Sequence, residues 1–212
     1  MRASGLSSYE LTKEEEVALD LFDNDNYFRE YGLGEMFEVK SNPQLNKDSF
    51  SFSDKGEYPY FTRTVLNNGI AGYVDYLNEE NKIKGNSIAV GMLGMQFFYM
   101  ERDFYAGQFT KTIYPKGSKI PNFDKQIAQY FIVLLNKHQK SFQSMLVRDF
   151  EKMFKHKTIP LPTQNNTPDF TFMSTFISAI SKLVIKDVVD FAASKISAYE
   201  RVIKQNKQTN QI

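Results

Sequence analysis

The sequence contains no cysteine, only two histidines and no long apolar run. Without thiols the chain has neither a disulfide framework nor a thiolate metal site, which is compatible with a reducing compartment. His138 and His156 have no cysteine or second histidine close by in sequence, and this argues against a zinc site. Residues 1–8 lack the apolar stretch of a signal peptide, and no segment approaches the roughly 18 apolar residues of a membrane span. We therefore expect a cytoplasmic protein that does not enter membranes.

Sequence motifs of several enzyme classes are also missing. The only Asn-Pro pair, Asn42-Pro43, is followed by Gln44 and not by the second proline and aromatic residue of an adenine methyltransferase pocket. No Gly-x-x-x-x-Gly-Lys-Ser/Thr run is present to hold the phosphates of ATP. Residues 80–82 form a Glu-x-Lys triplet like that of metal-dependent nucleases, but no Pro-Asp precedes it. The sequence therefore predicts a non-catalytic protein.

Aromatic residues and segregated charge are what the chain does have. It contains 19 Phe and 12 Tyr among 212 residues, which suits one substantial packed domain with an appendage. Residues 1–30 carry three basic and eight acidic residues, whereas residues 111–157 carry ten basic and three acidic ones. The second stretch is attractive to nucleic acid, because each phosphate that a Lys or Arg neutralises releases counterions. A solvated basic face is the alternative interpretation.

A β-hairpin is predicted in the first half of the chain. Two β-rich runs, residues 58–66 and 70–76, flank Asn67-Asn68-Gly69, and Asn-Gly favours the positive φ of a tight hairpin turn. Arg63 and Thr64 lie close to this turn. Arg and Asn have forked donors and acceptors that match guanine and adenine edges, so the hairpin is a candidate for reading DNA. An ordinary solvated turn is the alternative.

The remaining pattern mixes helices and strands. Thr12, followed by acidic residues, predicts the start of a helix over residues 12–29, and Asn122 predicts the cap of a second helix. Further strands are expected at residues 87–92, 96–100 and 108–114, a short helix at 147–155, an edge strand at 159–162 and a linker at 164–167. Pro168 is expected to begin the last helix. This order predicts the α+β class.

The C-terminal segment, from about residue 170 to 206, predicts one long amphipathic helix. Its apolar residues recur every three or four positions: Met173, Phe176, Ile180, Val184, Val188, Ala192, Ile196, Tyr199 and Ile203. About 30 residues of helix span about 45 Å, more than the core of one such domain requires. The average step of about 3.75 residues does not support a strict heptad coiled coil. The stripe is expected to pack against the same helix of a second copy, or else against the chain's own domain.

Short runs along the chain carry a resemblance to a known family. They are residues 59–64, 67–75, 85–88, 98–99, 103–107, 159–162 and 168–170. In this order and spacing they resemble target recognition domains of restriction-modification specificity proteins, namely the Type I specificity subunits and the related Type IIB and IIG recognition modules. The resemblance covers roughly residues 31–173.

The resemblance implies the architecture and the assembly. It implies a recognition domain over residues 1–168, with a curled mixed β-sheet flanked by helices, and a long spacer or dimerisation helix with a polar tail over residues 169–212. Full-length Type I subunits carry two recognition domains and two spacer helices, and this chain has one of each. It therefore resembles half of such a subunit. A homodimer would read an interrupted palindrome, because protein symmetry is imposed on the DNA site.

The resemblance also implies the partners: double-stranded DNA, a modification subunit that carries S-adenosylmethionine, and a restriction subunit that uses ATP and Mg²⁺. The candidates for base reading are Arg63, Thr64, Asn67, Asn68, Gln96 and Arg102. The candidates for phosphate contacts are Lys84, Lys111, Lys116 and Lys119. Two other interpretations remain: an interaction or anti-restriction protein that binds the modification subunit without reading DNA, and the recognition fragment of a fused nuclease-methyltransferase.

Overall fold

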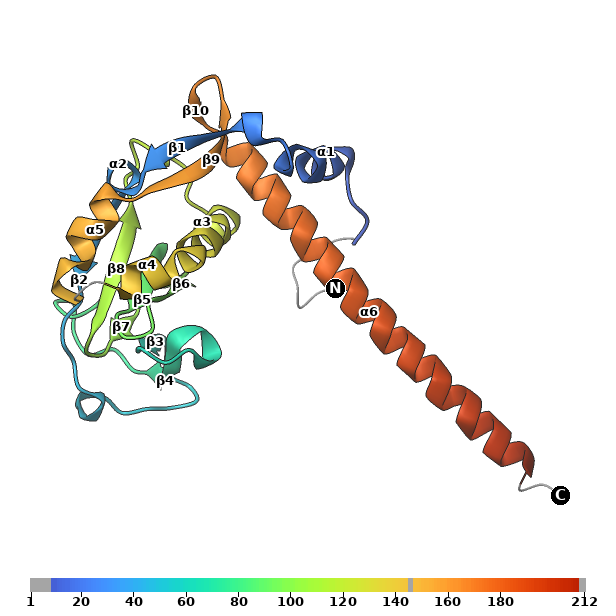
Figure 1. The fold of residues 1–212 in the computed structure, drawn as a ribbon. Coiled ribbons are helices and arrows are strands. Elements are labelled where there is room, and N and C mark those ends of the chain that lie inside the picture. The colour runs from blue at the N-terminus through green and yellow to red at the C-terminus, as the bar shows by residue number, and fades with distance from the viewer. Residues whose placement is uncertain (1–8, 145–146, 210–212) are drawn as a thin grey trace. The chain divides into compact units, whose positions relative to one another are not determined.

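The structure is a computed structural model that describes residues 9–144 and 147–209, with side chains of the last helix described up to residue 199. The chain divides into two compact units (Figure 1). One unit comprises Asn26–Met173, and the other comprises the described residues up to Asp25 together with those from Ser174 onward. Within the described ranges, no helix is long and apolar enough to cross a membrane.

A four-stranded antiparallel sheet forms the centre of the larger unit. Its strands, in spatial order, are β2 (Phe37–Ser41), β8 (Thr110–Pro115), β5 (Ser87–Gly91) and β6 (Gln96–Met100). Every residue of β5 is buried, as expected for a small and apolar strand between two neighbours. The strands predicted at residues 87–92 and 96–100 are confirmed. The third begins at Thr110 instead of residue 108, because Phe109 has a φ of 58° and cannot continue a strand.

Two three-stranded sheets complete the strands of this unit. One contains β4 (Ile70–Val74), β3 (Tyr58–Phe61) and β7 (Tyr105–Ala106), in that order. Strand β3 pairs antiparallel with β4 and parallel with β7, so this sheet is mixed. The other contains β1 (Phe28–Gly32), β9 (Thr158–Gln164) and β10 (Thr167–Pro168).

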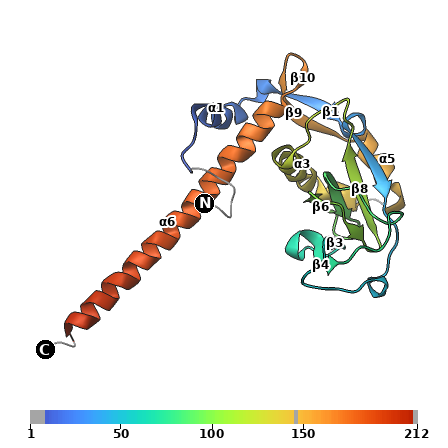
Figure 2. The same ribbon diagram turned by 180° about the vertical axis from the view of Figure 1, so that it is seen from behind.

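Four helices cover these sheets: α2 (Leu33–Met36), α3 (Lys125–Lys137), α4 (Gln139–Gln143) and α5 (Phe150–His156). Helix α3 packs on β6 and β5 (Figure 2). Its N-cap is Asp124 and not the predicted Asn122, because the Asp124 carboxylate accepts a 2.8 Å hydrogen bond from the Ile127 backbone N–H. Short 3₁₀ turns connect the elements at Asp25–Tyr27, Lys47–Ser49, Leu66–Gly69 and Val147–Asp149.

A cluster of phenylalanines forms the core between the sheet and these helices. Phe97 of β6 lies 5.6 Å from Phe142 of α4, measured between ring centroids, and Phe142 lies 5.6 Å from Phe150 of α5. All three side chains are fully buried. Buried aromatic pairs at such distances contribute about 0.5–1.5 kcal/mol each beyond their area burial. The predicted aromatic core is therefore confirmed.

The edge strand predicted at residues 159–162 is confirmed, because these residues of β9 pair only with β1. The linker predicted at residues 164–167 is wrong. Asn165 and Asn166 have φ values of 50° and 62°, so they form a two-residue hairpin turn that joins β9 to β10. Strand β9 therefore pairs with β1 over residues 158–162 and with β10 over residues 163–164. Its prolines are tolerated there because β10 pairs only with the last two residues of β9, beyond Pro162.

The N-terminal helix, α1 (Lys13–Phe22), is shorter than predicted. The capping box at Thr12 is confirmed: Glu15 N–H donates to Thr12 Oγ1 at 3.3 Å, and Thr12 N–H donates to Glu15 Oε2 at 2.8 Å. The helix stops at Phe22 because the Asp-Asn-Asp-Asn run of residues 23–26 favours turns over a helix interior.

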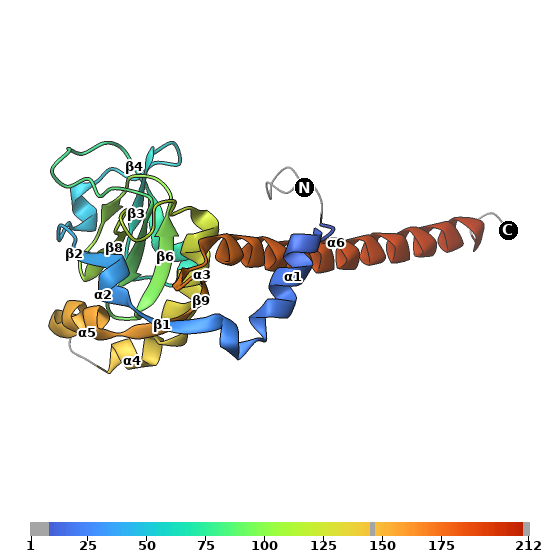
Figure 3. The same ribbon diagram turned by 90° about the horizontal axis from the view of Figure 1, so that it is seen from above.

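The last helix, α6 (Phe170–Thr209), packs against α1 within the smaller unit (Figure 3). Phe22 and Phe176 stack with ring centroids 4.4 Å apart. Beside them Lys182 Nζ lies 2.8 Å from Glu15 Oε2, and Ser178 Oγ donates to Glu15 Oε1 at 2.8 Å. Both members of this ion pair are buried. Helix α6 begins at Phe170, two residues after the predicted Pro168, because Asp169 caps it and accepts a hydrogen bond from Phe172 N–H at 2.8 Å.

The ion pair shifts the pKa of its carboxyl group. Burial by itself raises the pKa of Glu15, but hydrogen bonds from Lys182, Thr12 and Ser178, together with the Lys182 charge, outweigh burial. The net pKa is therefore lower than the ordinary value.

The apolar stripe of α6 is only partly covered. Met173 is fully buried and Phe176 is partly buried. Beyond them the predicted residues are exposed: Ile180, Val184, Val188, Ala192, Ile196 and Tyr199. The side chain of Ile203 lies outside the described part of the helix.

Candidate nucleic-acid interface

The connection between β3 and β4 carries four of the predicted base-reading residues. The antiparallel pairing of the predicted hairpin is confirmed, with Phe61 opposite Ile70. The prediction of a tight turn is wrong, because β3 ends at Phe61 and a longer loop over residues 62–69 connects it to β4. The predicted positive φ is confirmed: Asn67, Asn68 and Gly69 have φ values of 48°, 52° and 80°.

Two of these four side chains make hydrogen bonds within the loop, and the other two do not. Asn67 Nδ2 donates to the Ile70 carbonyl at 3.2 Å, and Thr64 Oγ1 accepts from Leu66 N–H at 3.2 Å. These two side chains therefore stabilise the loop. Arg63 and Asn68 are exposed, and neither side chain makes a hydrogen bond to any described residue. Their polar groups are consequently available to a ligand.

Arg63 and Asn68 have different neighbours in the structure. The Arg63 guanidinium carbon lies 5.5 Å from the centroid of the Phe109 ring, which is a cation–π contact. Asn68 lines a cavity of about 300 Å³ together with residues of β6 and α3, including Lys125 and Gln129. The two side chains therefore face different surroundings.

Strand register places Arg63 at one end of the four-stranded sheet. We call this end, formed by Ser41, Gly91, Gln96 and Lys111, the hairpin end. A Cβ atom added to Gly91 would lie 2.8 Å from the Arg63 Cα, so the loop backbone passes directly over Gly91. Lys111 Nζ donates to Ser41 Oγ at 2.7 Å. The structure therefore places Arg63, Thr64, Gln96 and Lys111 at the same end of the sheet.

Four other candidates lie at the opposite end of the sheet, formed by Phe37, Ser87, Met100 and Pro115. They are Lys84, Arg102, Lys116 and Lys119. The backbone of Gly85 lies against that of Arg102, and Lys116 Nζ donates to the Gly34 carbonyl at 2.6 Å. Gln96 and Arg102 are separated by six residues of extended chain, which is roughly 20 Å. Eight of the ten candidates therefore form two groups that are too far apart to contact the same base pair, and the other two, Asn67 and Asn68, lie on the β3–β4 connection.

The sequence predicts a long polar loop over residues 41–55, and the family resemblance implies that such loops approach DNA, but no contact residue of this loop could be named from the sequence. In the structure this loop is attached to β8 and to the segment before it. The buried Asn42 Nδ2 donates to Thr110 Oγ1 at 3.0 Å, and its Oδ1 accepts from Thr112 Oγ1 at 2.7 Å. Nearby, Gln108 Nε2 donates to Asn46 Oδ1 at 2.8 Å. No sequence signal could identify these pairs, because more than 60 residues separate their members.

The attached loop lines one part of an open cavity of about 380 Å³, which we call the loop cavity. Residues that line it include Asn46, Lys47, Tyr60, Arg63, Thr64 and Gln108. Burial, with a contribution from the Asp48 carboxylate, raises the pKa of Tyr60, so its hydroxyl stays protonated and donates to the Leu45 carbonyl at 3.2 Å. The lining carries amides, hydroxyls and two cationic side chains but no carboxylate. This set of groups suits a polar and anionic ligand.

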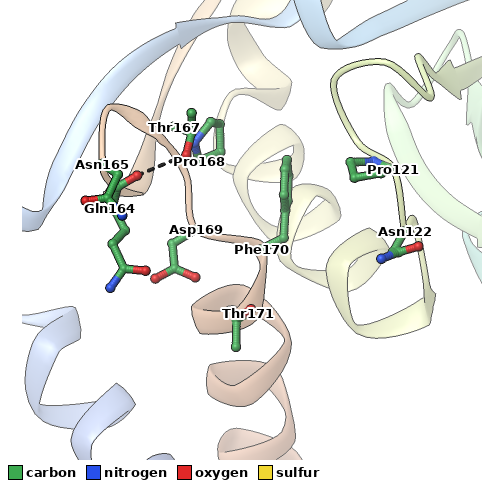
Figure 4. Close-up of a pocket in the computed structure, with 9 residues that line it drawn as sticks. All are labelled: Pro121, Asn122, Gln164, Asn165, Thr167, Pro168, Asp169, Phe170 and Thr171. Atoms are coloured by element: carbon green, nitrogen blue, oxygen red, sulfur yellow. Dashed lines mark hydrogen bonds between the residues drawn. The ribbon is translucent and has the colours of Figure 1, made fainter.

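A second polar cavity, of about 320 Å³, lies at the start of α6 (Figure 4). Asn165, Thr167 and Asn122 line it, together with Asp169. The Asp169 carboxylate is fully engaged, because Oδ1 caps the helix and Oδ2 accepts from the Tyr27 hydroxyl at 2.6 Å. Among the residues that the structure describes, no cluster of His, Asp or Glu could hold a metal ion.

These features define a recognition domain that continues into a long helix with an exposed apolar face. The chain belongs to the family of Type I restriction modification DNA specificity domains, whose model matches residues 27–190. No curated protein sequence matches the chain significantly.

Solved structures are similar in fold. The S subunit of a Type I restriction-modification system from M. genitalium aligns with a TM-score of 0.52 at 17% identity, over 87% of this chain and 49% of that one. The HsdS subunit from Thermoanaerobacter tengcongensis aligns with a TM-score of 0.52 at 12% identity, over 85% of this chain and 44% of that one. These likenesses confirm the predicted α+β recognition fold with its long helix. The chain spans about half the length of these subunits.

Proposed function

We propose that this chain is the DNA specificity subunit of a restriction-modification system, and that it reads one half of a bipartite site. It is a non-catalytic cytoplasmic protein that directs a modification subunit, which binds S-adenosylmethionine, to that site. A restriction subunit that uses ATP and Mg²⁺ joins the same complex. Membership of the specificity-domain family supports this role, as does the fold shared with Type I subunits.

The observation that carries the proposal is the hairpin end. Arg63 is exposed and is held over Phe109, and it lies at the same end of the sheet as Gln96 and Lys111. Arg matches the guanine edge with two parallel donors, whereas Lys111 is suited to a backbone phosphate. Within this function, Arg63, Asn68 and Gln96 contact bases. Lys84, Arg102, Lys116 and Lys119 contact DNA further from the hairpin end.

The exposed stripe of α6 supports a homodimer. Val184, Val188, Ile196 and Tyr199 expose 57%, 62%, 60% and 68% of their surface, and a free helix with such a face is costly in water. A second copy that buries the stripe supplies the second recognition domain, which the single chain lacks. The preferred DNA site is then an interrupted palindrome.

Selection of duplexes from a random library tests the proposal. The purified full chain is used alone and with its modification subunit, at two salt concentrations. We expect enrichment of an interrupted palindrome, with tighter binding at the lower salt concentration. Salt-sensitive binding without sequence enrichment in both preparations would contradict the proposal. Tight binding to the modification subunit in that case would favour an interaction protein.

A further inference from the structure

Phe109 has an unusual backbone conformation for an exposed aromatic residue. Its φ is 58°, a region that bulky residues rarely occupy, and 47% of its surface is exposed. Both of its backbone polar groups are held: its N–H donates to Gln44 Oε1 at 3.0 Å, and its carbonyl accepts from Met92 N–H at 2.9 Å. The surrounding contacts therefore impose this conformation, which places the ring beneath Arg63.

The contact between the two side chains restricts Arg63. An arginine on the surface loses rotamer freedom when it binds a ligand, and this loss lowers affinity. The guanidinium group over the Phe109 ring is already ordered, while its N–H groups are free of hydrogen bonds to described residues. The ring therefore orients Arg63 for two-donor contact with a planar acceptor edge.

Asn46 and Gln108 form an exposed pair of amides in the lining of the loop cavity, which Arg63 also lines. Their single mutual hydrogen bond uses one N–H and one oxygen. The Gln108 oxygen remains as an acceptor and the Asn46 amide nitrogen as a donor. If oxygen and nitrogen are exchanged in both amides, Asn46 provides the free acceptor and Gln108 the free donor, so the pair still presents one of each. The pair therefore presents one donor and one acceptor side by side.

This donor and acceptor arrangement is complementary to adenine. In the major groove adenine presents an acceptor at N7 and a donor at N6, whereas guanine presents only acceptors there. Gln44 is not available for such contact, because its Nε2 donates to the Asn42 carbonyl at 2.9 Å while its Oε1 holds Phe109. The lining of the loop cavity thus contains an amide pair that matches adenine and an arginine that matches guanine.

We propose that the Asn46–Gln108 pair reads an adenine in the half-site and that Arg63, oriented by Phe109, reads a neighbouring guanine. Gln44 is a positioning residue that fixes Phe109. This assignment rests on the proposed function, because it requires that the chain bind duplex DNA through the loop cavity. It adds specificity residues from the loop over residues 42–57 to those of the β3–β4 connection.

Selection from random duplexes with the full chain and its modification subunit tests the assignment. Gln108→Ala removes one of the two amides of the pair, so selection for adenine at one position of the half-site should fall by about 10-fold, the scale of one lost base contact. Gln126→Ala, which removes an exposed glutamine of α3, is the matched control and should leave the site unchanged.

Arg63→Lys tests the neighbouring position, where we expect preference for guanine to fall while the adenine preference remains. Gln44→Ala should also weaken the guanine preference, whereas Gln44→Glu, which keeps an acceptor for the Phe109 N–H, should preserve it. Identical sites for the unaltered protein and the Gln108→Ala protein would overturn the assignment and leave the proposed function standing. Absence of any selected site with the unaltered protein would overturn both.

Discussion

The two compact units have different interiors. The larger unit closes around fully buried aromatic side chains, including Phe61, Phe104 and Phe131. The smaller unit, made of α1 and α6, buries an ion pair and leaves large apolar residues such as Phe191 exposed by 64%. The larger unit has an aromatic core of its own, whereas most of the apolar stripe of α6 in the smaller unit is exposed. Stability and DNA reading are therefore expected to depend on the first unit, and assembly on the second.

Removal of a buried ring should give the largest effect on stability. Phe131→Ala in α3 leaves a cavity beneath the sheet and should lower the free energy of unfolding by about 3–5 kcal/mol. Phe191→Ala removes a ring of the same size from the exposed surface of α6, and should change the stability of the monomer by less than about 0.5 kcal/mol. Urea denaturation at low protein concentration measures both values. Equal losses would contradict the proposed difference between the units.

The buried ion pair gives the next largest effect. Lys182→Met leaves the Glu15 carboxylate buried without its cation, and should lower stability by about 3 kcal/mol near pH 7. The double variant Glu15→Met with Lys182→Met removes both charges and should recover most of this loss. Protection of α1 amides from hydrogen exchange reports the effect on this unit directly. A single variant as stable as the double variant would show that the pair is not effectively buried.

The same pair predicts a dependence on pH. The pKa of Glu15 is lowered by folding from an ordinary value of 4.5. Its carboxylate therefore contributes stability that is complete above about pH 4.5 and is lost as pH falls through the lower folded-state value. Amide exchange in α1 should accelerate in this acid range in the unaltered protein. In the double variant without either charge, this acceleration should be absent.

Substitution of the exposed stripe should affect only assembly. Val188→Asp places a carboxylate within the apolar face that we propose a second copy covers, and should weaken self-association by about 2 kcal/mol or roughly 30-fold. Asp187→Ala, at the adjacent exposed position, is the control. Sedimentation over a range of concentrations measures both. Unchanged association of Val188→Asp would exclude this face as the dimer contact.

Local sequence rules identified elements well but assigned one turn to the wrong place. Asn-Asn pairs occur at residues 67–68 and 165–166, and all four residues have positive φ. Only the second pair forms a two-residue hairpin, and the sequence suggested a linker there. The first pair lies in a longer loop, where the strand register shifts between Tyr60 and Phe61 and Gly69 packs against the Phe61 ring. These constraints come from tertiary packing, which the local sequence does not contain.

The candidate site was predictable only in its local part. Arg63 and Asn68 follow from a turn signal within one hairpin, and the structure leaves their side chains free of hydrogen bonds to described residues. Asn46 and Gln108 were missed, since their contact depends on how residues 42–57 fold against the segment before β8. The sequence also suggested that Gln96 and Arg102 belong to one group of base-reading residues. The antiparallel register places them at different ends of β6.

The smallest effect is expected from a phosphate contact. Lys111→Ala removes one cation at the hairpin end and should weaken binding to all duplexes alike, while the dependence of log K on log salt falls by about one. Lys152→Ala on α5 is the control, because α5 packs on α2 near the opposite end of the sheet. Fluorescence anisotropy with a selected and an unrelated duplex at several salt concentrations distinguishes these roles. A loss confined to the selected duplex would show that Lys111 contacts a base, and the division between reading and positioning residues at the hairpin end would then require revision.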